Sequence, residues 1–306
     1  MSKRSRTSRP ALMATAATAA LTLALAGCGS NTDSSHSSAM PGMDHSNTPS
    51  HSASAGAMAS MPGMDTASTG NGLTAAKDGY RMTSTTSGLP SDRSADYRFT
   101  VTGPDGRPVT DFAVDQTQRM HFYAVRTDLT GFQHLHPTMA KNGTWTAPLA
   151  ALQPGTWRLY ASFTPNSGSG KGKHLVLSRT VKVSGMPMTT ALPKASGTTT
   201  ADGYTITVKG GPMAGMAHRL TTTITKDGKP VTDLQPYLDT YAHLTAFHQG
   251  DLAFAHLHPE TKADGDHGGP ALTFHAEFAQ PGNWRLYLQF RTDGKLHTAA
   301  LTLHVN

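Results

Sequence analysis

Six histidines form two sets of three with the same internal spacing. Each set has one histidine upstream of a His-Leu-His-Pro motif, and the two motifs start 122 residues apart. The sets are His121, His134 and His136 in the first copy, and His243, His256 and His258 in the second. Imidazole is the commonest metal ligand in proteins, so a doubled three-histidine pattern predicts metal binding. The alternative is that these histidines are structural and cap a hairpin through hydrogen bonds.

Methionines indicate which metal would bind. Five of the 14 methionines lie in a polar segment near the N-terminus, four of them in two Met-Pro-Gly-Met motifs, and a related Met-x-x-Met motif precedes a predicted strand. The candidate ligands in these motifs are Met40, Met43, His45, Met61 and Met64 in the segment, and Met213, Met216 and His218 near the strand. Thioether sulfur is a soft ligand that favours Cu⁺. The sequence therefore favours copper, as Cu⁺ or Cu²⁺, with zinc possible.

A hairpin would bring each set of histidines together. In the second copy, a turn centred on Gly250-Asp251 pairs Thr245 with His256 and His243 with His258. The same alignment in the first copy pairs Tyr123 with His134 and His121 with His136. Directly opposed residues share a face, as do residues two apart on one strand. We therefore expect one three-imidazole site on each hairpin. Phe and Val on the same face leave open that it packs into the core.

The strands that carry these hairpins belong to a duplicated domain. Residues 105–137 and 227–259 align without a gap and are identical at 13 of 33 positions. After an insertion in the second copy, Pro154–Tyr160 matches Pro281–Tyr287. Self-similarity of this kind indicates one structural unit repeated twice.

Each copy has the pattern of an all-β, immunoglobulin-like sandwich. Alternating apolar residues, separated by turn-forming clusters, predict about seven strands per copy. In Trp284–Phe290 the Trp, Leu and Phe residues fall on one face and Arg, Tyr and Gln on the other, which predicts a half-buried strand. The first copy should run from a strand at 80–86 to one at 174–183. In the second copy the predicted strands are 204–209, 218–225, 242–248, 252–258, 272–278, 284–290 and 296–305.

The N-terminal residues predict export and a lipid anchor. Four basic residues precede an uncharged stretch, residues 11–27, that is too short for a comfortable membrane span. It ends in Leu-Ala-Gly-Cys, which resembles the cleavage box of bacterial lipoproteins, so Cys28 would carry the lipid and hold the protein on the outer face of the cytoplasmic membrane. An ordinary secretion signal with a chance cysteine is the alternative. The predicted organisation is a signal peptide (1–27), a disordered tether (28–72), sandwich 1 (73–184), a linker (185–201) and sandwich 2 (202–306).

Composition excludes several functions. Without the four basic residues of the signal there are 22 basic and 20 acidic residues, a net charge of +2, so nucleic-acid binding has no electrostatic basis. Cys28 is the only cysteine, which excludes a disulfide within the chain, a cysteine-based zinc site and a blue-copper centre. Neither an acid/base pair nor a nucleophile elbow is present, so we do not expect an enzyme.

The repeated motifs resemble a known group of proteins. The motifs are Asp-Gly-x-Pro-Val-Thr-Asp, a following histidine, His-x-His-Pro and Pro-Gly-x-Trp-Arg-Leu. Over residues 96–183 and 203–305 the chain resembles actinobacterial secreted lipoproteins with tandem β-sandwich domains. It is more distantly similar to YtkA-like and periplasmic copper-resistance sandwiches. The resemblance implies an exported copper-handling role for the six repeated histidines. Some copper-resistance sandwiches also use a free N-terminal amine, which acylated Cys28 would not provide.

Two functions follow from these observations. The first is a surface-anchored lipoprotein that buffers copper or delivers it to a copper-handling envelope protein. The second is an envelope protein-interaction module of tandem immunoglobulin-like domains, in which the histidines are structural. Metal binding near neutral pH separates the two.

Overall fold

The computed structural model describes residues 71–306. The predicted signal peptide, Cys28 and the methionine motifs at 40–45 and 61–65 lie outside the described residues. Strands dominate the described part of the chain, which confirms the all-β prediction of two tandem immunoglobulin-like sandwiches. Within residues 71–306, no helix has the length and apolar character needed to cross a membrane.

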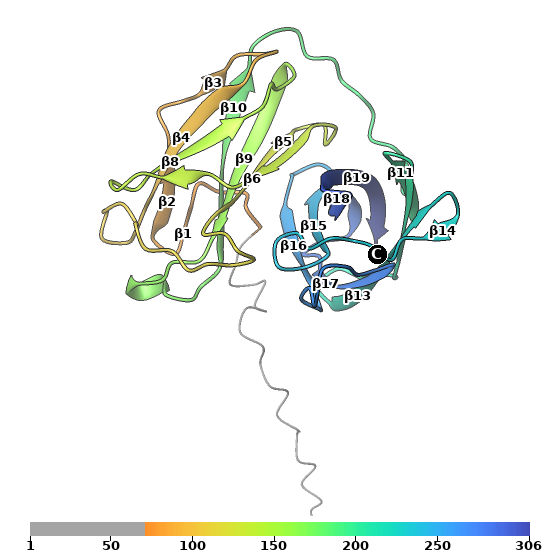
Figure 1. Ribbon diagram of the computed structural model, residues 1–306. Helices are drawn as coiled ribbons and strands as arrows, with labels where there is room; N and C mark the ends of the chain where they lie inside the picture. Colours follow the sequence, from red (N-terminus) through yellow and green to blue (C-terminus); the bar gives the residue numbers. More distant parts are fainter. Residues whose placement is uncertain (1–70) are drawn as a thin grey trace, which may run out of the picture. The chain divides into compact units, whose positions relative to one another are not determined.

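The first copy is a sandwich of two five-stranded sheets. One sheet has the order β1-β2-β4-β8-β7 and the other β3-β10-β9-β5-β6, and Figure 1 shows these strands as two layers. Tyr97, Phe99, Phe122 and Trp145 are among the aromatic residues packed between the layers. The strands are β1 (Ala76–Lys77), β2 (Tyr80–Thr83), β3 (Gly88–Leu89), β4 (Ala95–Thr102), β5 (His121–Arg126), β6 (Phe132–Leu135), β7 (Thr138–Met139), β8 (Thr144–Leu149), β9 (Gly155–Phe163) and β10 (Leu175–Val183).

In the second copy, one sheet folds around the core. Its strand order is β11-β12-β13-β17-β16-β15-β18-β19, with β14 on β13. Each of the seven predicted strands is present within a few residues of its expected bounds. The strands are β11 (Thr198–Ala201), β12 (Tyr204–Lys209), β13 (Ala217–Lys226), β14 (Lys229–Pro230), β15 (Ala242–His248), β16 (Phe254–Pro259), β17 (Ala271–Glu277), β18 (Gly282–Thr292) and β19 (Lys295–Val305). The strand β11 lies within the range expected to be linker.

The hairpin registers agree with the prediction in their central parts. Tyr123 pairs with His134 in the first copy, and Thr245 pairs with His256 in the second. The predicted two-residue turn is wrong, because backbone bonds from Arg126 to Gly131 and from His248 to Ala253 each close a four-residue loop. The register of both strands is unchanged, since the loops remain centred on the expected residues.

The outermost predicted pairs are not part of these ladders. The pairing of β5 with β6 ends at Leu135, so His136 lies beyond the ladder. The pairing of β15 with β16 ends at Leu257, and His258 pairs with His275 of β17 instead of His243. The expected pairing of His121 with His136 and of His243 with His258 is therefore wrong. In the second copy the physical reason is that β16 crosses from one layer of the sandwich to the other.

Candidate metal centre

The face that carries the histidines is buried in both copies. All six residues of β5 are buried, and so are the first six of β15. On β5, Phe122 and Ala124 belong to the core of the first sandwich, whereas Tyr123 and Val125 belong to a third apolar cluster. This third cluster combines residues of both copies: Tyr123, Val125, Leu129, Tyr160 and Val176 from the first, and Phe247, Leu252, Phe254 and Tyr287 from the second. The histidine faces of the two sandwiches therefore pack against each other.

This packing corrects one expectation from the sequence. The polar face of Trp284–Phe290 was expected to leave the strand half-buried, yet Tyr287 and Gln289 are each only 4% exposed. The other sandwich covers them, since Tyr287 stacks on Phe132 with ring centroids 4.1 Å apart. The strand therefore packs on both faces, with one face against the core of its own sandwich and the other against the neighbouring sandwich.

Reciprocal hydrogen bonds hold the interface at both ends. The Tyr160 hydroxyl donates to the carbonyl oxygen of Leu252 at 2.6 Å, and the equivalent Tyr287 hydroxyl donates to the carbonyl oxygen of Leu129 at 2.6 Å. Each acceptor belongs to the hairpin loop of the other copy. The two repeats therefore bind each other with approximate two-fold symmetry.

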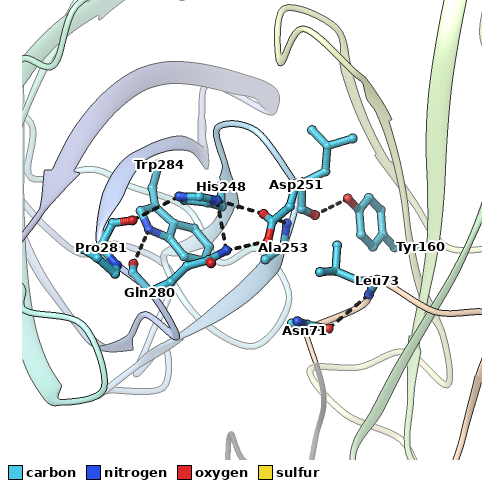
Figure 2. Close-up of polar contacts among 10 residues, drawn as sticks. Asn71, Leu73, Tyr160, His248, Asp251, Ala253, Gln280, Pro281 and Trp284 are labelled. Carbon is cyan, nitrogen blue, oxygen red and sulfur yellow. Dashed lines mark hydrogen bonds and ion pairs between the residues drawn. The ribbon is translucent and has the colours of Figure 1, made fainter.

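The loop that receives Tyr160 is braced by a polar network, shown in Figure 2. Nδ1 of His248 lies 2.8 Å from Oδ1 of Asp251, and Nε2 of Gln280 donates to Oδ2 of Asp251 at 2.7 Å. The ring of His248 also packs on Trp284. His248 is thus a structural part of the hairpin loop. It does not belong to the group formed by His121, His134 and His243.

Three imidazoles from the two sandwiches converge in this interface. His121 and His134 come from the first copy and His243 from the second, and one ligand nitrogen from each lies within 4.8 Å of the others. His121 is 2% exposed and His243 is 1% exposed. The three histidines form a buried cluster that could hold a metal ion. The sequence led us to expect one site on each hairpin. The structure instead shows one cluster whose members come from both hairpins.

Hydrogen bonds outside the cluster fix the proton positions of two of its rings. Nε2 of His121 lies 3.1 Å from the carbonyl oxygen of Asp115, which can only accept, so Nε2 carries the proton. Nδ1 of His134 lies 2.7 Å from Oε1 of Gln289, so Nδ1 carries the proton there. In the neutral rings, Nδ1 of His121 and Nε2 of His134 are then both unprotonated. These two nitrogens face each other at 3.1 Å.

Aromatic contacts orient the third ring. Nε2 of His243 lies 3.1 Å from the hydroxyl oxygen of Tyr123. Tyr123 also stacks on His134, with ring centroids 4.4 Å apart, and His134 stacks on His243 at 4.7 Å. Every cluster member is thus oriented by a hydrogen bond to an atom outside the cluster, as metal-ligating histidines usually are.

Burial keeps the cluster neutral. It lowers the pKa of His121, and it lowers the pKa of His134 and of His243 well below the usual value. The neighbouring imidazoles lower the pKa of His134 and His243 further, since their positive charges would repel each other. Neutral imidazole is the form that binds metal ions.

The other predicted ligands occupy different positions. The ring of His136 lies at the edge of the cluster, 4.8 Å from that of His134, and burial lowers its pKa to about 4. Nε2 of His136 is buried without a hydrogen-bond partner among residues 71–306. Burial also lowers the pKa of His258 in β16. For His256 the structure gives the backbone register alone.

The second methionine motif lies elsewhere on the second sandwich. Met213 is 43% exposed, Met216 is 50% exposed, and His218 pairs with Ala276 in the ladder between β13 and β17. None of the three belongs to the buried group of His121, His134 and His243.

Several residues of the site were not foreseen from the sequence. Gln289 and Tyr123 orient histidines of the cluster, and His174 is bonded to Ser162 at 2.7 Å between Nε2 and Oγ. One signal was available: Tyr123, Val125 and Phe247 place large apolar groups on the face of their strands that carries the histidines. Strands that are apolar on both faces are usually buried on both.

Comparisons with known proteins identify the repeat. Residues 74–185 and 199–306 each match the model of the family described as Domain of unknown function (DUF8832). The chain belongs to the DUF8832 family. The two DUF8832 domains coincide with the two sandwiches, which confirms the repeated domain. No curated protein matches the sequence significantly.

Solved structures similar to the two DUF8832 domains include adhesins and other tandem-domain proteins. The Escherichia coli adhesin FdeC has 15% identity and a TM-score of 0.22, with 76% of this chain and 65% of that chain covered. InvD of Yersinia pseudotuberculosis has 14% identity and a TM-score of 0.23, with 76% and 58% covered. The Ig1-2 module of Drosophila DLAR has 8% identity and a TM-score of 0.20, with 74% and 98% covered. This chain thus spans less than two thirds of the FdeC and InvD structures.

Proposed function

We propose that this protein is a surface-anchored copper-binding lipoprotein that buffers or delivers copper outside the cytoplasmic membrane. The observation that carries the proposal is the 3.1 Å separation of Nδ1 of His121 and Nε2 of His134 within a group of three imidazoles. The outer hydrogen bonds of the two rings leave both of these nitrogens without a proton in the neutral rings.

Two lone pairs that face each other repel unless a cation lies between or beside them. Two nitrogens bound to one ion at about 2.0–2.1 Å lie about 3.1–3.4 Å apart, which agrees with the observed separation. A proton could take this position, but burial lowers the pKa of both rings. A metal ion satisfies both nitrogens, and the adjacent His243 supplies the third ligand.

The chemistry of the ligands favours copper. The three candidate ligands are neutral imidazoles. They would not compensate the positive charge of an ion bound in this site. Burying a single charge costs less than burying two, which favours Cu⁺ over Zn²⁺. The methionine motifs at 40–45 and 61–65 are further soft ligands that suit Cu⁺. Cys28 would attach the protein to the membrane, and a copper-handling envelope protein would be its partner.

A second function is an interaction module in which the histidines are structural. It is favoured by the hydrogen bonds from the imidazoles to Asp115, Gln289 and Tyr123, which also tie the interface together. In that case the cluster would hold the two domains in place without an ion.

A copper titration of the chain from residue 71 onward separates the two functions, because this chain lacks the N-terminal methionine motifs. We expect one equivalent of Cu⁺ to compete successfully with a chromogenic chelator. The double variant His121→Ala/His134→Ala should lose this binding. The matched control His267→Ala/His304→Ala, which changes two exposed histidines, should keep it. If the parent chain binds no copper, or if the His121/His134 variant binds as tightly as the parent, the interaction module replaces the copper protein.

A further inference from the structure

The metal site depends on both sandwiches at once, and this follows from where the ligands come from. The first sandwich supplies His121 and His134, and the second supplies His243. We infer that the site exists only while the two DUF8832 domains are docked, and that a bound ion locks them together. This inference rests on the proposed function.

The orienting bonds cross the interface in both directions. Gln289 of the second sandwich fixes His134 of the first, at 2.7 Å between Oε1 and Nδ1. Tyr123 of the first sandwich fixes His243 of the second, at 3.1 Å between the hydroxyl oxygen and Nε2. A separated first sandwich would keep two ligands, one of which would have lost its orienting partner. Undocking therefore removes His243 from the site of the first sandwich, and it also removes the hydrogen bond that orients His134.

Burial of two of the three ligands limits the exchange of a bound ion while the interface is closed. His121 and His243 are almost inaccessible to solvent, His134 is half-buried, and the ring of Tyr123 stacks on His134. Loading and release should therefore be faster when the sandwiches separate locally. Because an ion that binds only the docked state stabilises that state, copper should shift the chain towards closure.

The docked state has its own contacts apart from the ion. Val125 and Phe247 are fully buried in the interface cluster, outside the core of either sandwich. The reciprocal bonds of Tyr160 and Tyr287 add to these apolar contacts. The interface can therefore be weakened at residues that are not ligands.

Charged substitutions at this interface provide the test. In the chain from residue 28 onward with Cys28→Ser, the double variant Val125→Asp/Phe247→Asp buries two carboxylates if the sandwiches dock, so it should hold them apart. Two quantities are measured. The first is the Cu⁺ affinity of the imidazole site, obtained by competition with a chelator in a background where the methionines of the motifs at 40–45 and 61–65 are changed to leucine. The second is the radius of gyration, obtained by X-ray scattering. We expect an affinity loss of at least about 100-fold, because the ligand from the tethered domain loses its effective concentration. The control Met186→Asp, at an 86% exposed position, should behave as the parent.

The outcomes separate this inference from the proposed function. If the separated sandwiches bind Cu⁺ as tightly as the parent, each hairpin has a site of its own and the inference is wrong, although the copper function stands. If the parent itself shows no imidazole-dependent binding, the proposed function fails.

A second measurement keeps the test decisive if the double variant does not fold. Hydrogen exchange of the unmodified interface, read at the amides of residues 244–257 with and without Cu⁺, should show slower exchange with the ion. Unchanged exchange in a copper-bound chain would overturn the inference.

Discussion

The chain continues differently after the His-Leu-His-Pro segment in the two repeats. In the first copy β6 stops at Leu135, and the chain resumes as β7 in the other sheet. In the second copy β16 continues through His258 and Pro259 and pairs with β17, which joins the two layers. Extending the register of β7 and β8 by two residues would place His136 opposite Pro148, the position equivalent to His275. Proline has no N–H to donate, so the ladder cannot continue there.

The residues around the histidines differ more than the histidines do. Tyr123 bonds to His243, but its equivalent in the second copy is Thr245, which is too short for the same role. Gln289 lies opposite His243 on the neighbouring strand and reaches His134, whereas its equivalent Ser162 lies opposite His121 and bonds to His174. The repeated histidines are therefore duplicated but the residues that orient them are not. One asymmetric site can thus arise from a nearly symmetric pair of domains.

The largest expected effect is the response of the metal-free protein to acid. Burial lowers the pKa of the interface histidines, and it lowers the pKa of His136 and His174 to about 4. The unfolded chain takes up protons near pH 6.5, while the folded chain does so only at lower pH. The stabilisation that comes from keeping these histidines neutral should thus be fully present above pH 6.5. The free energy of unfolding should fall as the pH drops towards 4. Each pKa unit of a single group is worth about 1.4 kcal/mol.

Urea unfolding at several pH values measures this effect. The variant His136→Gln/His174→Gln should flatten the dependence on pH, because it removes two first-copy histidines that resist protonation in the folded state. The variant His267→Gln/His304→Gln, with both changes at exposed positions, should leave it unchanged. Equal slopes for both variants would show that these first-copy histidines are not protected from protonation by the fold.

The next effect concerns how the two sandwiches close. His275→Pro should remove the pairing of His258 with residue 275 and lower the free energy of unfolding by about 3 kcal/mol, since proline removes a backbone hydrogen bond from the interior of the ladder. The matched change Pro148→Ala in the first copy should alter it by less than about 1 kcal/mol. Denaturant unfolding of the two variants checks this. Comparable losses would mean that β16 does not need its pairing with β17.

The smallest effect concerns the orienting residues. Gln289→Leu keeps the size of the side chain but removes the acceptor for Nδ1 of His134, so Cu⁺ affinity should fall about 10- to 100-fold. Ser162→Ala, at the equivalent position of the first copy, should leave the affinity unchanged. Chelator competition measures both. A loss with Ser162→Ala as large as with Gln289→Leu would show that the two copies contribute equally to the site.

The sequence determined the strands, the duplication and the central register of both hairpins. These properties are local: alternation of apolar residues sets a strand, and the loop between two strands sets which residues face each other. Tyr123 opposite His134 and Thr245 opposite His256 could therefore be predicted. The residue types alone also made the repeated histidines candidate ligands.

Tertiary structure decided which histidines meet. Alternation shows that His121, Tyr123 and Val125 share a face, but it does not show what covers that face. The second sandwich covers it, which brings His243 to His134 and Gln289 into reach of the same ring. A ligand set drawn from two domains depends on packing between residues more than 100 positions apart, and no local pattern in the chain encodes that contact.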